Sequence, residues 1–135
     1  MTATPYLAFD GKCEEAFAFY AKVLGGSITA MHRHEGTPAE AHVPAEWKHK
    51  VMYARIDAAG AVLEGGDAPM GQYTKPAGFC VNLAFTADQM GDAERIYAEL
   101  SEGGKVQMPL GETFWAKRFG MFIDRYSIPW MINCA

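Results

Sequence analysis

The sequence has few of the features that mark several large protein classes. Its three cysteines, Cys13, Cys80 and Cys134, lie far apart and form no CxxC pair, so we predict reduced, mostly buried thiols in a cytoplasmic protein. No apolar run approaches the roughly 18 residues that a membrane-spanning helix needs. The first residues lack the basic start and the apolar segment of a secretory signal, so we expect none to be cleaved.

Excess basic charge and common catalytic motifs are also missing. Lys and Arg number 12 against 16 Asp and Glu, and the basic residues are scattered, which argues against a nucleic-acid partner. No Walker or Rossmann glycine pattern occurs, and Ser27, Ser101 and Ser127 lack a G-x-S-x-G setting. We therefore predict no nucleotide cofactor, and no other cofactor, and no serine nucleophile.

What the chain does contain is material for a core, and an internal repeat. Half of its 135 residues are hydrophobic, which suits one globular domain. A short apolar strand, an amphipathic helix and a Gly-Gly pair occur in that order in residues 5–26 and again in 79–104. The shift that places Tyr20 on Tyr97 also places Gly26 on Gly103. Similarity at a fixed offset predicts a duplicated unit.

Each copy is predicted to run strand, helix, strand, strand, strand. Helical spacing of apolar residues predicts helices over 14–24 and 88–100, the second capped by Thr86 or Asp88. The first module covers about 4–66 and the second about 79–134, joined by an irregular linker over 67–78. The predicted strands are 5–9, 27–34, 50–56 and 61–64 in the first module, and 79–85, 105–108, 116–124 and 129–133 in the second.

Several motifs resemble one family closely. They include Pro5-Tyr6-Leu7, Cys13-Glu14-Glu15-Ala16, Gly66-Asp67-Ala68, Phe114-Trp115-Ala116-Lys117-Arg118-Phe119-Gly120-Met121 and Pro129-Trp130-Met131-Ile132-Asn133. Over nearly the whole chain the sequence is similar to the PhnB-like branch of the vicinal oxygen chelate superfamily, which contains glyoxalase I, bleomycin-resistance proteins and extradiol dioxygenases. The resemblance implies an α+β fold in which two tandem βαβββ modules form a curved mixed sheet around a cavity. It also implies a homodimer.

The resemblance further implies where a metal ion would bind. Metal-dependent relatives use His and Glu on the first, fourth, fifth and last strands. The matching positions here hold Pro5 or Tyr6, Glu64, Phe79 or Cys80, and Met131. Since a single carboxylate does not hold a metal, we predict that the family metal site is lost. His32 and His34, together with His42 or His49, could instead form a different metal site. The competing interpretation is that His32 and His34 are solvent-exposed residues of an edge strand.

Strand alternation selects the residues that face a ligand. It places Tyr53 and Arg55 on one face of their strand and Glu64 on the inner face of the next. Relatives often carry His in place of Tyr53, and an apolar residue in place of Glu64. We therefore single out Glu64 as a catalytic candidate, either a general base with a raised pKa or an ion-pair partner of Arg55 or Arg118 with a lowered one. The inner-facing set is Tyr53, Arg55, Glu64, Cys80, Asn82 and Met131.

Aromatic and basic residues near the end of the chain suggest the kind of ligand. Trp115 and Arg118 suit a planar or anionic molecule, although Trp115 also fits the core or a dimer interface. Trp130 is predicted to be core, and Trp47 to be a lid or a dimer contact. The predicted ligand-binding residues are Tyr53, Arg55, Asn82, Trp115, Arg118 and Met131. The predicted function is binding of a small, anionic or aromatic molecule without a metal; the alternative is a metal-dependent lyase, isomerase or dioxygenase.

Overall fold

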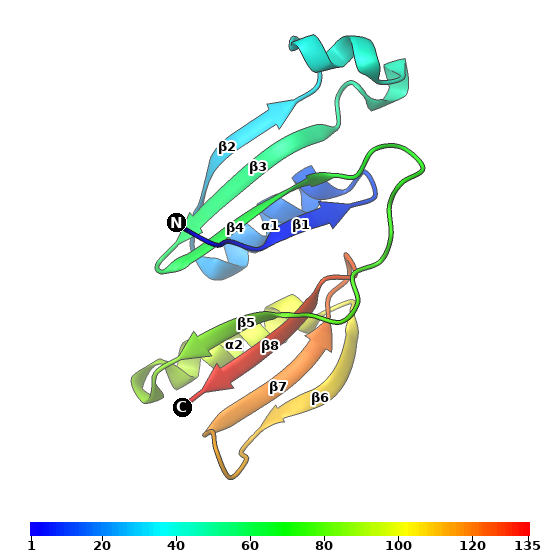
Figure 1. Ribbon diagram of the computed structural model, residues 1–135. Helices are drawn as coiled ribbons and strands as arrows, with labels where there is room; N and C mark the ends of the chain where they lie inside the picture. The colour runs from blue at the N-terminus through cyan, green and yellow to red at the C-terminus, as the bar shows by residue number, and fades with distance from the viewer. The chain divides into compact units, whose positions relative to one another are not determined.

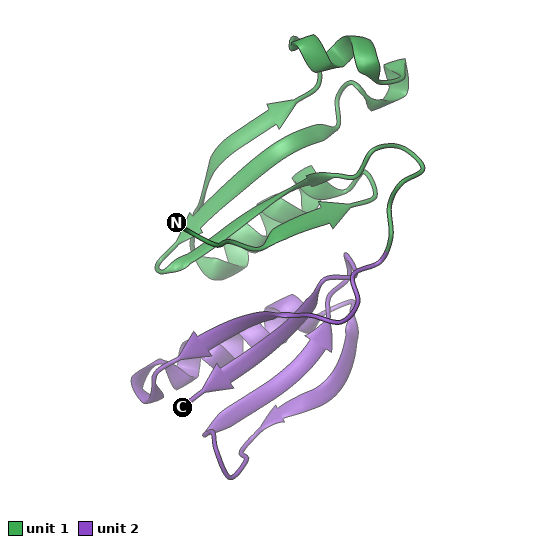
Figure 2. Cartoon of the chain, viewed as in Figure 1, with its two compact units in different colours: residues 1–74 green, residues 75–135 purple.

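Each half of the chain forms a four-stranded mixed sheet with one helix across one face (Figure 1). The computed structural model describes residues 1–135 and divides into two compact units, Met1–Thr74 and Lys75–Ala135 (Figure 2). The strand orders are β1-β4-β3-β2 and β5-β8-β7-β6, so the two sheets share one topology. The α+β fold with two tandem βαβββ modules is confirmed. Neither α1 nor α2 has the length and apolarity to cross a membrane.

The elements follow the predicted order closely. In the first unit they are β1 (Tyr6–Phe9), α1 (Cys13–Leu24), β2 (Ser27–Arg33), the short 3-10 turns η1 (Pro38–His42) and η2 (Ala45–Trp47), β3 (Val51–Ala58) and β4 (Ala61–Asp67). In the second they are β5 (Val81–Phe85), η3 (Ala87–Gln89), α2 (Met90–Ser101), β6 (Lys105–Gly111), β7 (Arg118–Ile123) and β8 (Pro129–Cys134).

Helix α1 is held to its sheet by aromatic side chains. Phe17 and Tyr20 are fully buried, and the Phe17 ring meets Phe9 of β1 edge-on, with centroids 5.9 Å apart. The first turn is fixed by the buried Asp67 carboxylate, which accepts hydrogen bonds from the backbone N–H groups of Cys13 and Val51, each at 2.9 Å. One side chain at the end of β4 thus ties the start of α1 to β3.

The second unit repeats this plan with different residues. Ala93, Ile96 and Leu100 of α2 are buried, and Tyr97 packs edge-on against the fully buried Phe122 of β7. Thr86 and Gln89 form a reciprocal capping box at the start of η3, the 3-10 turn that leads into α2. The residue at the N-cap of α2 itself is Gln89, not Thr86 or Asp88 as predicted.

The repeated Gly-Gly pair has one role for each glycine. The first glycine of each pair has a positive φ, 68° at Gly25 and 77° at Gly103. The second glycine of each pair has no room for a side chain. A Cβ at Gly26 would lie 2.7 Å from the Asp57 carbonyl oxygen, and a Cβ at Gly104 would lie 2.2 Å from the Ile123 carbonyl oxygen. The predicted match of Gly26 to Gly103 is therefore wrong by one residue, since α2 is followed by an additional residue before its turn.

Two predicted positions in the strands also differ from the structure. Phe79 lies before the start of β5 and is 53% exposed, whereas the sequence placed it in the strand. Met52 is exposed although alternation puts it with the buried Ala54 and Ile56, because the β2–β3 register shifts beside it. Ser127 has a φ of 70°, in the left-handed region that residues other than glycine seldom adopt.

Candidate functional site

The face of the first sheet opposite α1 carries a group of polar and aromatic side chains. Glu64 on β4 lies between Tyr6 on β1 and Arg55 on β3 in the strand register. Tyr53 and Asp57 share that face by alternation along β3. We call Tyr6, Tyr53, Arg55, Asp57 and Glu64 the first open face. The structure confirms that Tyr53, Arg55 and Glu64 lie on one face of their sheet, as alternation predicted.

Glu64 is at the centre of this face and is held by two hydroxyl groups. Its Oε1 accepts a short hydrogen bond from the Thr4 hydroxyl, and its Oε2 accepts one from the Tyr53 hydroxyl. These bonds, with a smaller contribution from the charge of Arg55, keep the pKa of the Glu64 carboxyl below its ordinary value. The sequence left open a raised pKa, for a general base, or a lowered one, from an ion pair with Arg55 or Arg118. The pKa is lowered, mainly by the hydrogen bonds from Thr4 and Tyr53.

Arg55 is engaged elsewhere on the same face. Its Nε and Nη2 atoms lie 3.0 and 3.1 Å from the two carboxylate oxygens of Asp57, a bidentate pair on one strand. Asp57 also accepts a hydrogen bond from the Thr29 hydroxyl at 2.9 Å. The pKa of Asp57 is lowered by its bonds to Arg55 and Thr29. The guanidinium is therefore fixed in place and its charge is largely balanced.

We expect Tyr53→Phe to raise the pKa of the Glu64 carboxyl, because the variant removes one hydroxyl that stabilises the carboxylate. A folded-state pKa below the unfolded value gives stability that is present above the unfolded pKa and is lost as pH falls through the folded pKa. The stability gap between wild type and variant should therefore be seen at neutral pH and should close on acidification. Carboxyl-detected NMR titration and denaturant unfolding at several pH values measure the two quantities.

Tyr6→Phe is the matched control for this prediction. The Tyr6 hydroxyl donates to the Met52 carbonyl oxygen at 3.3 Å and makes no bond to Glu64. Its removal should leave the pKa of Glu64 unchanged. Equal pKa values for Glu64 in the wild type and in Tyr53→Phe would refute the assignment.

The corresponding face of the second sheet is more apolar. Asn82 and Met131 are neighbours across β5 and β8, and Met131 pairs in turn with Met121 on β7. Phe119 and Asn133 form the next pair along the same face. We call Asn82, Phe119, Met121, Met131 and Asn133 the second open face. The structure thus places the predicted residues Asn82 and Met131 side by side.

Aromatic rings extend the second open face beyond the strands. Trp115, half exposed, packs edge-on against Phe119 with ring centroids 5.2 Å apart. Phe114 stacks edge-on against Trp115 and is 97% exposed. Trp115 therefore belongs to a surface cluster of rings, whereas Trp130 is fully buried, as predicted for a core residue.

Arg118 lies on the opposite face of the second sheet. It pairs in register with Cys134, which is fully buried, and its Nε lies 3.1 Å from a carboxylate oxygen of Glu94 on α2. Its Nη1 donates to the Lys117 carbonyl oxygen at 2.7 Å. The structure therefore does not bring Arg118 together with Asn82 and Met131, because one residue along a strand reverses the direction of the side chain.

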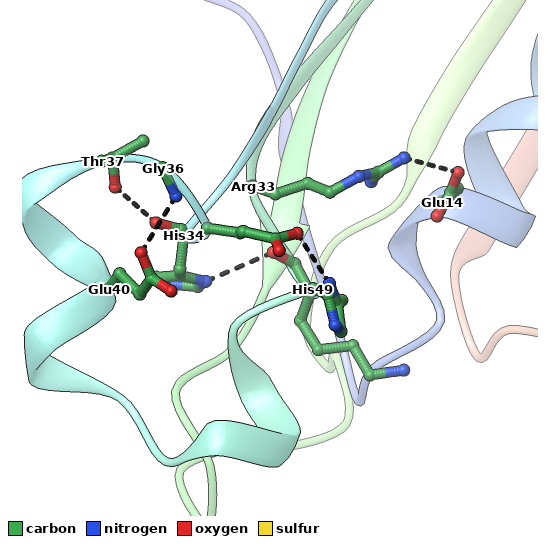
Figure 3. A network of polar contacts seen from close by, with 9 residues as sticks. Glu14, Arg33, His34, Gly36, Thr37, Glu40 and His49 are labelled. Carbon is green, nitrogen blue, oxygen red and sulfur yellow. Dashed lines mark hydrogen bonds and ion pairs between the residues drawn. The ribbon is translucent and has the colours of Figure 1, made fainter.

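Two of the histidines, His34 and His49, have different polar partners (Figure 3). His32 stacks on Tyr53, with ring centroids 6.1 Å apart, and His34 follows the end of β2, where its Nδ1 lies 3.2 Å from the Lys50 carbonyl oxygen. His49 pairs with Glu35 at 2.8 Å. The predicted strand ran to residue 34, but β2 ends at Arg33 after a register shift, so His34 lies outside the strand that carries His32.

The residues at the family's metal positions do not fit a divalent ion. Glu64 is bound by two hydroxyl groups, Tyr6 donates its hydroxyl to a backbone carbonyl, and Met131 offers only a thioether. No three His, Cys, Asp or Glu side chains gather in an arrangement suited to a metal.

Thr4 and Asp57 are members of the polar network that the sequence analysis did not identify. Thr4 reaches Glu64 because β1 and β4 are parallel neighbours, which is a matter of topology and leaves no local signal. Asp57 could have been predicted, since alternation from Arg55 places it on the same face, but the predicted strand ended at residue 56, whereas β3 continues to Ala58.

Comparison with known proteins agrees with the geometry. Residues 3–132 match the family described as the Glyoxalase/Bleomycin resistance protein/Dioxygenase superfamily. Protein YjdN of Escherichia coli strain K12 is 30% identical over 144 aligned residues, which cover 98% of this chain and 95% of YjdN.

Solved structures extend the comparison. Protein PA1353 from Pseudomonas aeruginosa is 41% identical and superposes with a TM-score of 0.82, covering 99% of this chain and 97% of that one. The PhnB protein from Bacillus cereus is 22% identical with a TM-score of 0.81 over the whole of both chains, a likeness of fold.

Proposed function

Because this chain belongs to the Glyoxalase/Bleomycin resistance protein/Dioxygenase superfamily, we propose that it binds a small organic molecule on its first open face, without a metal ion. The observation that supports this most is the hydrogen-bonded cluster around Glu64. Thr4 and Tyr53 fix the carboxylate, and Asp57 fixes Arg55 beside it, on a face that no helix covers. Side chains oriented in advance lose less conformational entropy when a ligand binds.

The second open face is a separate and more apolar surface. Asn82 offers an amide, Met131 an adaptable thioether and Trp115 a half-exposed ring, which suit an apolar or aromatic molecule. Arg118 has no part in the proposal, since Glu94 on the helix side engages it. The homodimer remains part of the proposal, because a second copy would cover apolar side chains such as Phe114.

Glu64 is proposed as a binding residue in preference to a general base. A carboxylate with a lowered pKa is a weaker base than an ordinary one, and abstraction of a proton next to a carbonyl calls for a stronger base. Its two hydroxyl partners instead hold it as an oriented hydrogen-bond acceptor.

We expect a library of small aromatic compounds, with neutral, anionic and cationic members, to include binders detectable by two-dimensional NMR of the labelled protein. The shifted resonances should cluster at Tyr53, Arg55 and Glu64. Glu64→Gln should weaken binding, whereas Glu99→Gln, on the exposed side of α2, makes the same charge change and should not.

Two results would contradict the proposal. One is that no compound shifts resonances of either open face. The other, against the metal-independent part, is a stoichiometric divalent metal in protein purified without chelators.

A further inference from the structure

The charges of the first open face do not cancel once its ion pair is counted. The Arg55 guanidinium is matched by the Asp57 carboxylate through two bonds of 3.0 and 3.1 Å. Glu64 is bonded only by the neutral hydroxyls of Thr4 and Tyr53. The only other Lys or Arg on β2, β3 or β4 is Arg33, which pairs with Glu14 of α1 at 2.8 Å (Figure 3). One negative charge, that of Glu64, is left over.

The Glu64 carboxylate also keeps unused hydrogen-bonding capacity. An ionised carboxylate has about four acceptor positions, and the two hydroxyls occupy one on each oxygen. The two hydroxyl groups donate their protons to the carboxylate and hold it in one orientation. That orientation also sets the direction in which its remaining lone pairs point. A ligand group that donates N–H bonds and carries positive charge satisfies those positions and the charge together.

Aromatic rings stand on both sides of this carboxylate. Tyr6 is its neighbour in the β1–β4 register and is 54% exposed. Tyr53, which donates to Glu64, is stacked on His32 with an angle of 17° between the ring planes. The faces of aromatic rings attract cations and stack on planar groups. The anionic ligand expected from Arg118 has no corresponding support, because Arg118 lies on the helix side of its sheet.

From this combination we infer that the first open face takes an organic cation, an ammonium or amidinium group attached to an aromatic or planar body, with Glu64 binding the charged group and Tyr6 and Tyr53 lining it. The inference rests on the proposed function and names the class of its ligand.

Three compounds of one shape and different charge test the inference. They are 2-phenylethylammonium, 2-phenylethanol and 3-phenylpropionate, each titrated into the labelled full chain at neutral pH and low salt, with NMR shifts as the readout. We expect the ammonium to bind about tenfold more tightly than the alcohol, as a charge-assisted bond implies, and the carboxylate to bind most weakly. In Glu64→Gln the ammonium should bind no better than the alcohol.

Two further variants separate Glu64 from charge in general. Glu99→Gln removes one negative charge on α2 and should leave the preference unchanged. Asp57→Asn removes the partner of Arg55 and should increase the affinity for 3-phenylpropionate. If Glu64→Gln does not fold, the order of the three affinities in the wild type decides whether the face prefers a cation.

The possible outcomes are distinct. Preference for the ammonium that depends on Glu64 supports the inference. Equal or tighter binding of the alcohol or the carboxylate overturns it and leaves small-molecule binding in place. Binding of none of the three compounds, with no other binder in the aromatic library, overturns the proposed function as well.

Discussion

Replacing Asp124 by alanine should lower the free energy of unfolding by about 3 to 5 kcal/mol, among the largest effects of a single change in this chain. The Asp124 side chain is 3% exposed and accepts three hydrogen bonds. The donors are the backbone N–H groups of Tyr126 and Ile128, at 2.8 and 3.0 Å, and the indole N–H of Trp130, at 2.8 Å. Alanine leaves these donors without that acceptor, and each one that is buried costs about 1 to 3 kcal/mol.

Asp124→Asn separates the parts of this effect. Its amide oxygen can still accept from the two backbone N–H groups, but its NH₂ faces the indole N–H, so two donors meet. We expect a loss between those of wild type and alanine. Asp92→Ala, on the exposed side of α2, should change stability by no more than about 0.5 kcal/mol. Denaturant unfolding measures all three variants, and a loss below about 1 kcal/mol for Asp124→Ala would show that the side chain is not a structural centre.

Gly104→Ala is expected to cost about 2 to 4 kcal/mol. A Cβ at this position would lie 2.2 Å from the Ile123 carbonyl oxygen and 2.9 Å from two backbone atoms of Asp124. These atoms belong to the backbone at the end of β7, so they cannot move aside as a flexible side chain would. The start of β6 must separate from β7 to make room. Thermal and denaturant unfolding give the size of the effect.

Two other glycines of the second unit provide controls, one expected to lower the stability slightly and one expected to raise it. Gly103→Ala meets only the Arg125 side chain, at 3.4 Å, and should cost about 1 kcal/mol through its positive φ alone. Gly91→Ala, inside α2 with no atom within 4 Å, should stabilise the protein by about 0.5 to 1 kcal/mol. Equal stability of Gly104→Ala and Gly103→Ala would mean that close packing does not explain why the second glycine is present.

Much of the fold could be predicted from periodicity. Spacing of apolar residues located α1 and α2, and alternation placed Tyr53, Arg55 and Glu64 on one face, because these patterns depend on local backbone geometry. The ends of the strands were less certain. Phe79 was predicted to lie in β5 but precedes it, because an aromatic residue fits an exposed segment before a strand as well as it fits the strand.

The polar contacts of the candidate site were harder to foresee. Hydrogen bonds from Thr4 and Tyr53 lower the pKa of the Glu64 carboxyl more than the charge of Arg55 does. Arg118, beside Trp115 and Phe119 in the chain, points to the helix side and pairs with Glu94. A partner far along the sequence depends on which strands are neighbours and in which register, and no local pattern encodes either.

The sequence by itself determined the repeated strand-helix-GlyGly unit and the family, because these depend on residue type and spacing along the chain. Only the tertiary structure decided that Gly26 and Gly104 are required by a neighbouring carbonyl oxygen, and that Glu64 keeps a charge which Arg55 does not balance. The physical reason is the same in both cases. Close approach and charge balance are set by atoms brought together from distant parts of the chain.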